Sequence, residues 1–378
     1  MKLLYLAPVN IHEKKIDGVA KKIFNQVAEF SKFFDVYMMS YRENNIAINH
    51  NQERQEIDSG VTHRRYALYR EANKLAQKEK FDCIYIRYPR CERNFIYLLS
   101  QLHSYGAKII SEIPTYPYIG EMFENPRKIA IAMADSVYRT RLKYYVQRIV
   151  TFSDDDFIFG IPTIRTINGI SFDNVEIVNH KIHKDSINLI SVAFNVNCHG
   201  YDRIIKGLEK YYAAGGTTEI HFKIVGDGSA DADYKKIIRE SPHLGGRVEL
   251  MGFQSGDALQ TLYDEADIAV NSLALYRIGL KKESTLKSKE YIAKGLPMLS
   301  STEVDGLDSE SNKKYVHLVP DCGDDINAKE IIDFYHQIYD GKDADKVAHE
   351  IREAGRKICD MSVTMKPVID FFLDTNSQ

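Results

Sequence analysis

The chain has 378 residues, which is too long for one ordinary hydrophobic core and suits two domains. Hydrophobic residues make up 44% of it and charged residues 27%, a globular composition that argues against long disordered stretches. A net charge of −3 gives no reason to expect a nucleic-acid partner, and no apolar run reaches the roughly 20 residues of a membrane helix. The five cysteines lack metal-ligand spacing, so we expect free thiols, no metal site and a cytoplasmic protein.

Short apolar runs alternate with helical patterns in the first part of the chain. Residues 3–7, 36–39, 83–86, 108–113 and 149–152 are apolar runs typical of buried parallel strands. Val19, Ile23, Val27 and Phe30 recur at helical spacing, and residues 70–78 and 94–102 also favour helices. Strands that alternate with helices predict βαβ units and a parallel sheet.

The same pattern begins again after a polar stretch at residues 179–185, which we interpret as a linker. Strands are expected at 188–193, 221–225, 248–251, 268–271 and 297–300, and helices at 201–212, 260–265 and 288–293. An amphipathic stretch at 344–357 leads to an apolar one at 368–373. We expect a first Rossmann-like domain at 1–180, a second at 186–345, and a helical tail at 346–378 that packs back on the first.

This α/β pattern predicts two doubly wound domains that face each other across a cleft. In open α/β sheets, ligands bind beyond the carboxyl ends of the strands. Two such edges suit a donor in one domain and an acceptor in the other.

A basic stretch, residues 276–297, carries the strongest chemical signal. A predicted strand ends at Asn271, a basic loop follows, and a helix begins near Thr285. Free N–H groups at a helix start attract anions, and Arg277 and Lys287 add full charges. Glu290 lies one turn after Lys287, where a carboxylate can accept hydrogen bonds from ribose hydroxyls. The stretch predicts a nucleotide diphosphate site; the simpler alternative is a solvated basic helix.

Two other loops of the second domain follow predicted strands. His199 precedes a glycine at the start of a helix, where an imidazole can donate to a phosphate, although a surface histidine beside a capping Asp202 is the alternative. Gly226 and Gly228 follow another strand, where glycine allows close approach of a ligand or forms a plain turn.

The first domain offers weaker signals. Gly18 precedes a helix and could be a simple cap. Glu112 ends a strand before a loop that contains Thr115, Tyr116 and Tyr118. Strand-end carboxylates in clefts are functional candidates, and aromatic rings stack on sugars. The alternative is a rigid turn with Glu112 at the surface.

Residues 126–148 carry six Arg or Lys residues and one acid, Asp135. Apolar Ile129, Met133, Val137 and Tyr144 alternate with them. A basic amphipathic helix can lie on an anionic membrane surface, so we weigh peripheral contact with the inner membrane face against an ordinary solvated helix.

The stretch 284–297 resembles the donor motif of family 4 retaining glycosyltransferases and is closest to a bacterial polysaccharide-biosynthesis subgroup. Its pattern, Ser-x-Leu-Lys-x-x-Glu-Tyr-x-Ala-x-Gly-x-Pro, is matched by Ser284, Leu286, Lys287, Glu290, Tyr291, Ala293, Gly295 and Pro297. The family's first glutamate falls at Lys282, with Glu283 one position away. The resemblance extends over nearly the whole chain.

The resemblance implies a GT-B fold and retaining transfer of a sugar from a UDP- or GDP-linked donor. The acceptor would be a saccharide or lipid-linked saccharide in surface polysaccharide synthesis, with no metal or other cofactor. Lys287, Arg277 and His199 would then hold the diphosphate, Glu290 the ribose, and Glu112 the acceptor hydroxyl. The further donor-side residues would be Gly18, Asn195, Gly226, Gly252, Phe253, Lys282, Glu283, Ser284, Thr285 and Leu286, and the acceptor-side residues Thr115, Tyr116 and Tyr118.

Three other classes of protein remain open. A sugar-nucleotide epimerase of the same fold would need acid and base carboxylates in the cleft. An NAD-dependent dehydrogenase is disfavoured because the first βα turn lacks Gly-x-Gly-x-x-Gly. A non-catalytic partner subunit of a glycosyltransferase would explain the replaced first glutamate.

Overall fold

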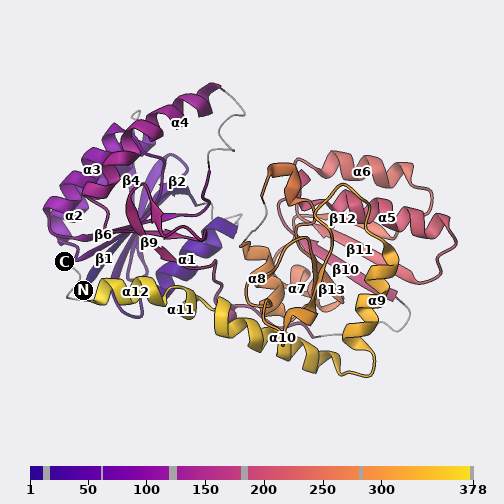
Figure 1. Cartoon of the computed structure of the whole chain (residues 1–378). Helices are drawn as coiled ribbons and strands as arrows, with labels where there is room; N and C mark the ends of the chain where they lie inside the picture. The colour runs from indigo at the N-terminus through magenta and orange to yellow at the C-terminus, as the bar shows by residue number, and fades with distance from the viewer. Residues whose placement is uncertain (12–17, 61–62, 119–125, 180–185, 281–283, 375–378) are drawn as a thin grey trace. The chain divides into compact units, whose positions relative to one another are not determined.

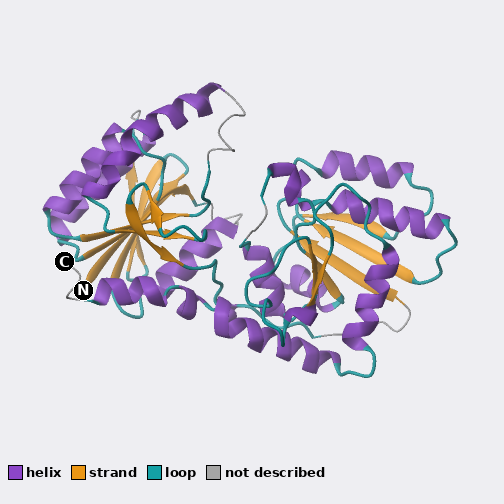
Figure 2. Cartoon of the chain, in the orientation of Figure 1, coloured by secondary structure: helices purple, strands orange, loops and turns teal. Residues whose placement is uncertain are grey.

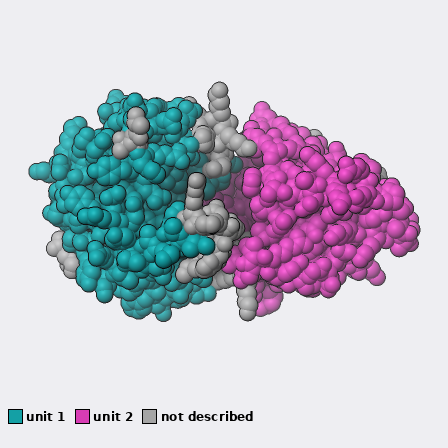
Figure 3. Space-filling model, turned by 90° about the horizontal axis from the view of Figure 1, so that it is seen from above, with its two compact units in different colours: residues 1–167, 361–378 teal, residues 168–360 magenta. Residues whose placement is uncertain are grey.

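The computed structural model describes residues 1–11, 18–60, 63–118, 126–179, 186–280 and 284–374, with the backbone alone for 126–128. The chain forms two compact units, residues 1–167 with 361–378 and residues 168–360 (Figure 3). The first unit therefore takes in the C-terminal end of the chain as well as its beginning. Each unit is an α/β structure with strands at the centre and helices around them (Figure 2).

Unit 1 is built on a nine-stranded sheet with the order β4-β3-β2-β1-β5-β6-β7-β9-β8 (Figure 1). Strands β2, β1, β5, β6, β7 and β9 lie side by side in this order and are parallel. At one edge β3 and β4 pair antiparallel, and at the other edge β8 does. The strands are β1 (Lys2–Asn10), β2 (Asp35–Arg42), β3 (Asn45–His50), β4 (Glu53–Asp58), β5 (Cys83–Arg87), β6 (Lys108–Ile113), β7 (Arg148–Thr151), β8 (Phe157–Ile158) and β9 (Ile161–Arg165).

Apolar side chains on both faces of this sheet explain its two helical layers. Along β1, Leu4 and Leu6 enter one core cluster, and Leu3 and Tyr5 enter the other. Strands buried on both faces need helices on both. The helices are α1 (Gly18–Phe30), α2 (Arg64–Glu79), α3 (Arg93–Ser104), α4 (Pro126–Tyr138), the 3₁₀ helix η2 (Arg139–Tyr144), α11 (Met361–Thr364) and α12 (Lys366–Leu373).

Unit 2 contains a fully parallel sheet with the order β12-β11-β10-β13-β14-β15. In order of appearance this is 3-2-1-4-5-6, the Rossmann order, which reverses direction between β10 and β13. The strands are β10 (Ser186–Val192), β11 (Glu219–Val225), β12 (Val248–Gly252), β13 (Ile268–Val270), β14 (Met298–Ser300) and β15 (Val316–Leu318). The α-helices are α5 (Tyr201–Ala213), α6 (Asp231–Glu240), α7 (Gly256–Asp264), α8 (Leu286–Lys294), α9 (Ala328–Tyr339) and α10 (Ala344–Cys359), and the 3₁₀ helices are η3 (Phe172–Asn174), η4 (Asn197–His199), η5 (Leu275–Ile278) and η6 (Lys313–Tyr315).

The C-terminal helix packs on the first unit, as the sequence predicts. Val368, Ile369 and Phe372 of α12 are buried in the core cluster that also contains Phe30 of α1. The units divide after residue 167 and again after 360, whereas the polar stretch at 179–185 suggested a later first boundary. Ile170 accounts for the earlier one, because its N–H donates to the carbonyl of Cys359 at 3.0 Å, within unit 2.

Among the described residues, no helix combines the length and apolar content needed to cross a membrane.

Candidate functional site

The site residues of unit 2 gather at the carboxyl ends of its strands, around the point where the strand order reverses. Asn195 and His199 follow β10, Gly226 follows β11, and Lys287 and Glu290 lie on α8 between β13 and β14. This is the edge where open α/β sheets bind their ligands.

The start of α8 is held in place by local hydrogen bonds. The Thr285 side chain caps the helix by accepting from the N–H of Ser288. The Ser284 hydroxyl accepts from the N–H of Asn168 at 3.1 Å. These contacts orient the first turn of α8, and with it Leu286 and Lys287.

Lys287 and His199 lie close together at this helix start. The Lys287 Nζ atom is buried and lies 5.8 Å from the centroid of the Tyr201 ring. Burial, and then the charge of Lys287, lower the pKa of His199 to about 2. His199 is therefore a neutral imidazole at physiological pH, and its buried Nδ1 has no hydrogen-bond partner among the described residues. A neutral imidazole beside an ammonium group suits an anionic ligand that accepts hydrogen bonds from both.

Glu290 follows one turn later on α8 and is half-buried. It faces Tyr263 of α7, since burial and then the Glu290 carboxylate raise the pKa of the Tyr263 hydroxyl. The Tyr263 side chain is fully buried, so it fixes one side of the carboxylate.

Among the described residues of unit 2, several buried hydroxyl groups at the same edge lack a hydrogen-bond partner. They belong to Ser191, Ser272, Ser301 and Thr302, at the ends of β10, β13 and β14. Buried polar groups are rarely left unpaired, because each costs on the order of 1–3 kcal/mol. Together with His199, they place unsatisfied polar groups at this edge, which suits a ligand rich in oxygen atoms.

Arg277, on η5, is paired with an acidic residue of the same unit. Its guanidinium makes a two-pronged ion pair with Asp202 of α5, at 2.8 and 2.9 Å, and also donates to the carbonyl of Asn197 at 2.8 Å. The hydrogen bonds to Asp202 raise the pKa of Arg277. Arg277 thus ties η5 to the start of α5, and its contact with a diphosphate stays a prediction.

The glycines after β11 allow the chain to approach itself. A Cβ on Gly226 would lie 1.8 Å from the carbonyl oxygen of Ala193, and one on Gly228 would lie 1.9 Å from that of Asn195. Asn195 is fully buried and donates to the Gly226 carbonyl at 3.1 Å. Gly226 and Asn195 therefore join two loops at this edge.

Two exposed aromatic rings flank this pair of loops. Phe253 follows Gly252 at the end of β12 and is 46% exposed, and Phe194 follows β10 and is 69% exposed. Phe194 was missed in the sequence, although a large aromatic residue just after a strand could have drawn attention. Two flat apolar surfaces at this edge suit a nucleobase.

In unit 1, Glu112 is fully buried at the end of β6. Its carboxylate accepts hydrogen bonds from Lys22 (3.1 Å), Gln26 (2.6 Å), Tyr85 (2.7 Å) and Arg87 (2.8 Å). Burial raises the pKa of Glu112, but Lys22 and Arg87, with these hydrogen bonds, outweigh it and lower the pKa to about 2. Glu112 is thus an ionised anchor between α1, β5 and β6, and contact with an acceptor hydroxyl stays a prediction.

The loop after β6 contains both buried and accessible residues. Tyr118 is buried and donates to the buried carboxylate of Asp135 on α4, while Thr115 is exposed and Tyr116 half-buried. Gly18 begins α1 and is exposed. Of the three predicted acceptor-side residues, Thr115 and Tyr116 are therefore accessible to a ligand and Tyr118 is not. Lys282 and Glu283 lie outside the described residues.

Sequence comparisons find no relative: no family model matches the chain, and no curated protein sequence matches it. Solved structures do match. A glycosyltransferase from Rickettsia africae is 12% identical over 98% of both chains, with a TM-score of 0.64. WaaG, a glycosyltransferase involved in lipopolysaccharide biosynthesis, is 10% identical over 98% of this chain and 99% of WaaG, with a TM-score of 0.63. HepE from Anabaena, solved with UDP and glucose, is 12% identical over 98% of this chain and 99% of HepE, with a TM-score of 0.55.

These similarities extend over both units and establish the fold. The chain has the GT-B fold of two Rossmann-like domains that these glycosyltransferases share.

Proposed function

We propose that this protein is a glycosyltransferase that uses a nucleotide-diphosphate sugar, with the donor bound at the carboxyl edge of the sheet in unit 2. The observation that carries the proposal is a group of buried polar atoms at that edge that have no hydrogen-bond partner among the described residues. The Nδ1 atom of His199 and the hydroxyls of Ser191, Ser272 and Thr302 belong to it, beside the charge of Lys287. A diphosphate and a sugar carry many oxygen atoms that can form hydrogen bonds with these groups.

The residues divide between the parts of the donor. Lys287, His199 and the first turn of α8 would stabilise the diphosphate, whose negative charge grows as it leaves. Glu290 would accept from the ribose hydroxyls, and Phe194 and Phe253 would lie against the base. Both UDP and GDP fit this division, and the structure of HepE with UDP and glucose makes UDP the first to test.

We further propose that the protein belongs with the retaining family 4 enzymes that its motif resembles. The bond between the anomeric carbon and the diphosphate oxygen breaks, the acceptor oxygen bonds to the same face, and its proton passes to the leaving phosphate. This scheme assigns no step to a metal or other cofactor. The acceptor would be a saccharide or lipid-linked saccharide in surface polysaccharide synthesis, a context that the likeness to WaaG supports.

A membrane-bound acceptor would give the outer face of α4 a purpose. Ile129, Met133 and Val137, four residues apart on this helix, are exposed, with Met133 at 67%, and exposed Arg141 and Tyr144 follow on η2. An exposed apolar row beside basic residues suits an anionic lipid surface on the cytoplasmic side. Cosedimentation with anionic vesicles should fall in Met133→Glu, and equal binding by variant and wild type would contradict this contact.

A transfer assay tests the function. Radiolabelled UDP- and GDP-sugars are mixed with the purified protein and a membrane extract as the source of acceptor. The proposal predicts a labelled product that is lost in Lys287→Ala. Conversion of the donor sugar without an acceptor would indicate an epimerase, and neither transfer nor hydrolysis with any donor would indicate a non-catalytic subunit.

A further inference from the structure

Unit 1 contains a pocket of about 460 Å³ at the edge of its sheet opposite to the loop that follows β6. Its lining includes Val146, Gln147 and Arg148 at the amino end of β7 and Ile161 at the amino end of β9. Gly18 and Thr115 instead follow the carboxyl ends of β1 and β6. Because β6, β7 and β9 are parallel, the pocket and the acceptor loop lie a strand length apart, on the order of 13–20 Å. The volume lies within the usual range for small-molecule sites, about 300–1,000 Å³.

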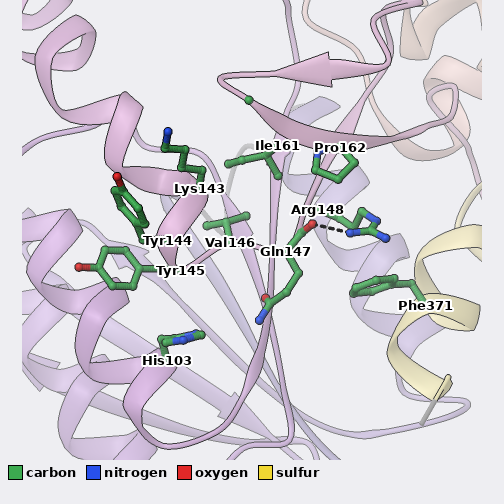
Figure 4. A pocket seen from close by; sticks show the side chains of 11 residues that line it. His103, Lys143, Tyr144, Tyr145, Val146, Gln147, Arg148, Ile161, Pro162 and Phe371 are labelled. Atoms are coloured by element: carbon green, nitrogen blue, oxygen red, sulfur yellow. Dashed lines mark hydrogen bonds between the residues drawn. The ribbon is translucent and has the colours of Figure 1, made fainter. Parts of the chain in front are cut away.

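The lining of the pocket is basic. Lys143, Arg148 and His103 contribute to it, and none of its described lining residues is Asp or Glu. In the described part of the chain, neither Lys143 nor Arg148 has a carboxylate partner. The structure gives the guanidinium of Arg148 one hydrogen bond, to the carbonyl of Gln147 at 2.8 Å, which leaves most of its five N–H groups for a ligand (Figure 4).

Lys108 of β6 adds to this positive charge. It lies 5.4 Å from the ring centroid of Phe371 and donates to the carbonyls of Phe371 and Asp374. Phe371 also lines the pocket, so Lys108 lies close to one of the lining residues.

Aromatic rings form part of the remaining lining. Figure 4 shows Tyr144 and Tyr145 on one side of the pocket and Phe371 on the other. Tyr144 is 64% exposed, and the guanidinium of Arg148 lies 4.9 Å from the centroid of the Phe371 ring. Exposed tyrosine rings offer flat apolar surfaces and a polar tip, which suits the ring of a sugar.

We propose that this pocket binds an anionic saccharide, a glycan unit that carries a carboxylate or a phosphate. Arg148 and Lys143 bind the negative group, and Tyr144 packs against the sugar ring. Simple inorganic anions would use the charges without the aromatic surface, and neutral sugars would use the aromatic surface without the charges. The site is separate from donor binding, so its occupation does not depend on the function proposed above.

Calorimetric titration of the full chain tests this site. The probes are a trisaccharide that carries one glucuronic acid, the same trisaccharide with glucose in its place, and inorganic phosphate. We expect the acidic trisaccharide to bind most tightly of the three, and its affinity to fall with added salt. An excess of UDP should leave the binding unchanged, since the nucleotide is assigned to the other unit.

Lys143 and Arg141 provide a matched pair of variants. Both are exposed basic residues of η2, but only Lys143 lines the pocket. Lys143→Gln should weaken binding of the acidic trisaccharide about fivefold and Arg141→Gln should leave it unchanged. Arg148→Gln should weaken this binding about tenfold or more. Because Arg148 also contacts Phe371 of α12, its replacement could loosen that helix, and Lys143→Gln then tests the site without this effect.

Three results would overturn the proposal. One is no binding of the acidic trisaccharide at millimolar concentration. Another is equal loss of affinity in Lys143→Gln and Arg141→Gln, which would indicate diffuse attraction by the basic surface. The third is displacement by UDP, which would assign the saccharide to the donor site.

Discussion

Glu112 and Lys287 are both charged residues near strand ends, and the structure gives them different surroundings. Lys287 lies at a helix start, as the local pattern of strand, basic loop and helix suggested, and the structure places it beside His199. Two of the four donors around Glu112 lie on α1 and two on β5, and each is at least 25 residues away in sequence. A sequence pattern shows a helix start but not such distant contacts, so the anchor at Glu112 could not be predicted.

Glu112→Ala tests the anchor through stability. Its removal leaves Lys22 and Arg87 buried without their counter-charge, which should lower the free energy of unfolding of unit 1 by about 3–5 kcal/mol. Asp156→Ala, which removes an exposed ion pair with Arg165 in the same unit, should cost less than about 1 kcal/mol. Urea denaturation measures both, and equal costs would contradict the assignment.

The pH dependence of stability provides a second test of Glu112. Its pKa is about 2 in the folded chain against an ordinary 4.5, so its stabilisation is complete above pH 4.5 and is lost as the pH falls towards 2. The unfolding free energy of wild-type unit 1 should therefore fall between about pH 5 and about pH 3 more steeply than that of Glu112→Gln. Parallel curves for the two proteins would show that Glu112 is not held ionised by the fold.

At the scale of elements, most of the parallel strands and several of their helices could be predicted because their apolar residues form short runs or helical stripes, whereas β9, β15 and α9 were not predicted. The antiparallel β3–β4 hairpin was missed. Most of β4 is exposed and polar, with the sequence Glu-Arg-Gln-Glu-Ile-Asp, so it has no apolar run to reveal it. Helix α6 was also missed: Tyr234 is its one buried residue. Elements that bury little leave a weak pattern.

The contact between the loops after β10 and β11 can be tested at Gly228. Gly228→Ala would place a Cβ 1.9 Å from the Asn195 carbonyl and force the two loops apart. We expect it to destabilise unit 2 by about 1–3 kcal/mol and to weaken nucleotide binding, since Asn195 and Gly226 shape the same edge. Gly245→Ala, where a Cβ meets nothing within 4 Å, should change stability by less than about 0.5 kcal/mol. Similar melting curves for the two variants would contradict this packing.

At the scale of the whole molecule, the C-terminal segment makes unit 1 depend on both ends of the chain. Phe372 of α12 is buried against Phe30 and Phe34, with ring centroids 6.2 and 6.1 Å away. Phe372→Ala should destabilise unit 1 by about 3–5 kcal/mol and leave unit 2 unchanged. Leu373→Ala, at a residue 42% exposed, is the control and should have little effect. Hydrogen exchange resolves the two units, and loss of protection in both would show that they unfold together.

The central claim is that unit 2 binds the nucleotide of the donor through Lys287 and Glu290. Calorimetric titration of the full chain with UDP and with GDP tests it most directly. We predict that wild type binds at least one of them, and that Lys287→Ala and Glu290→Ala each weaken the binding at least about tenfold while remaining folded. Lys235→Ala, at an exposed residue of α6, should keep the wild-type affinity. Unchanged affinity in both site variants, or no binding by the wild type, would contradict the account.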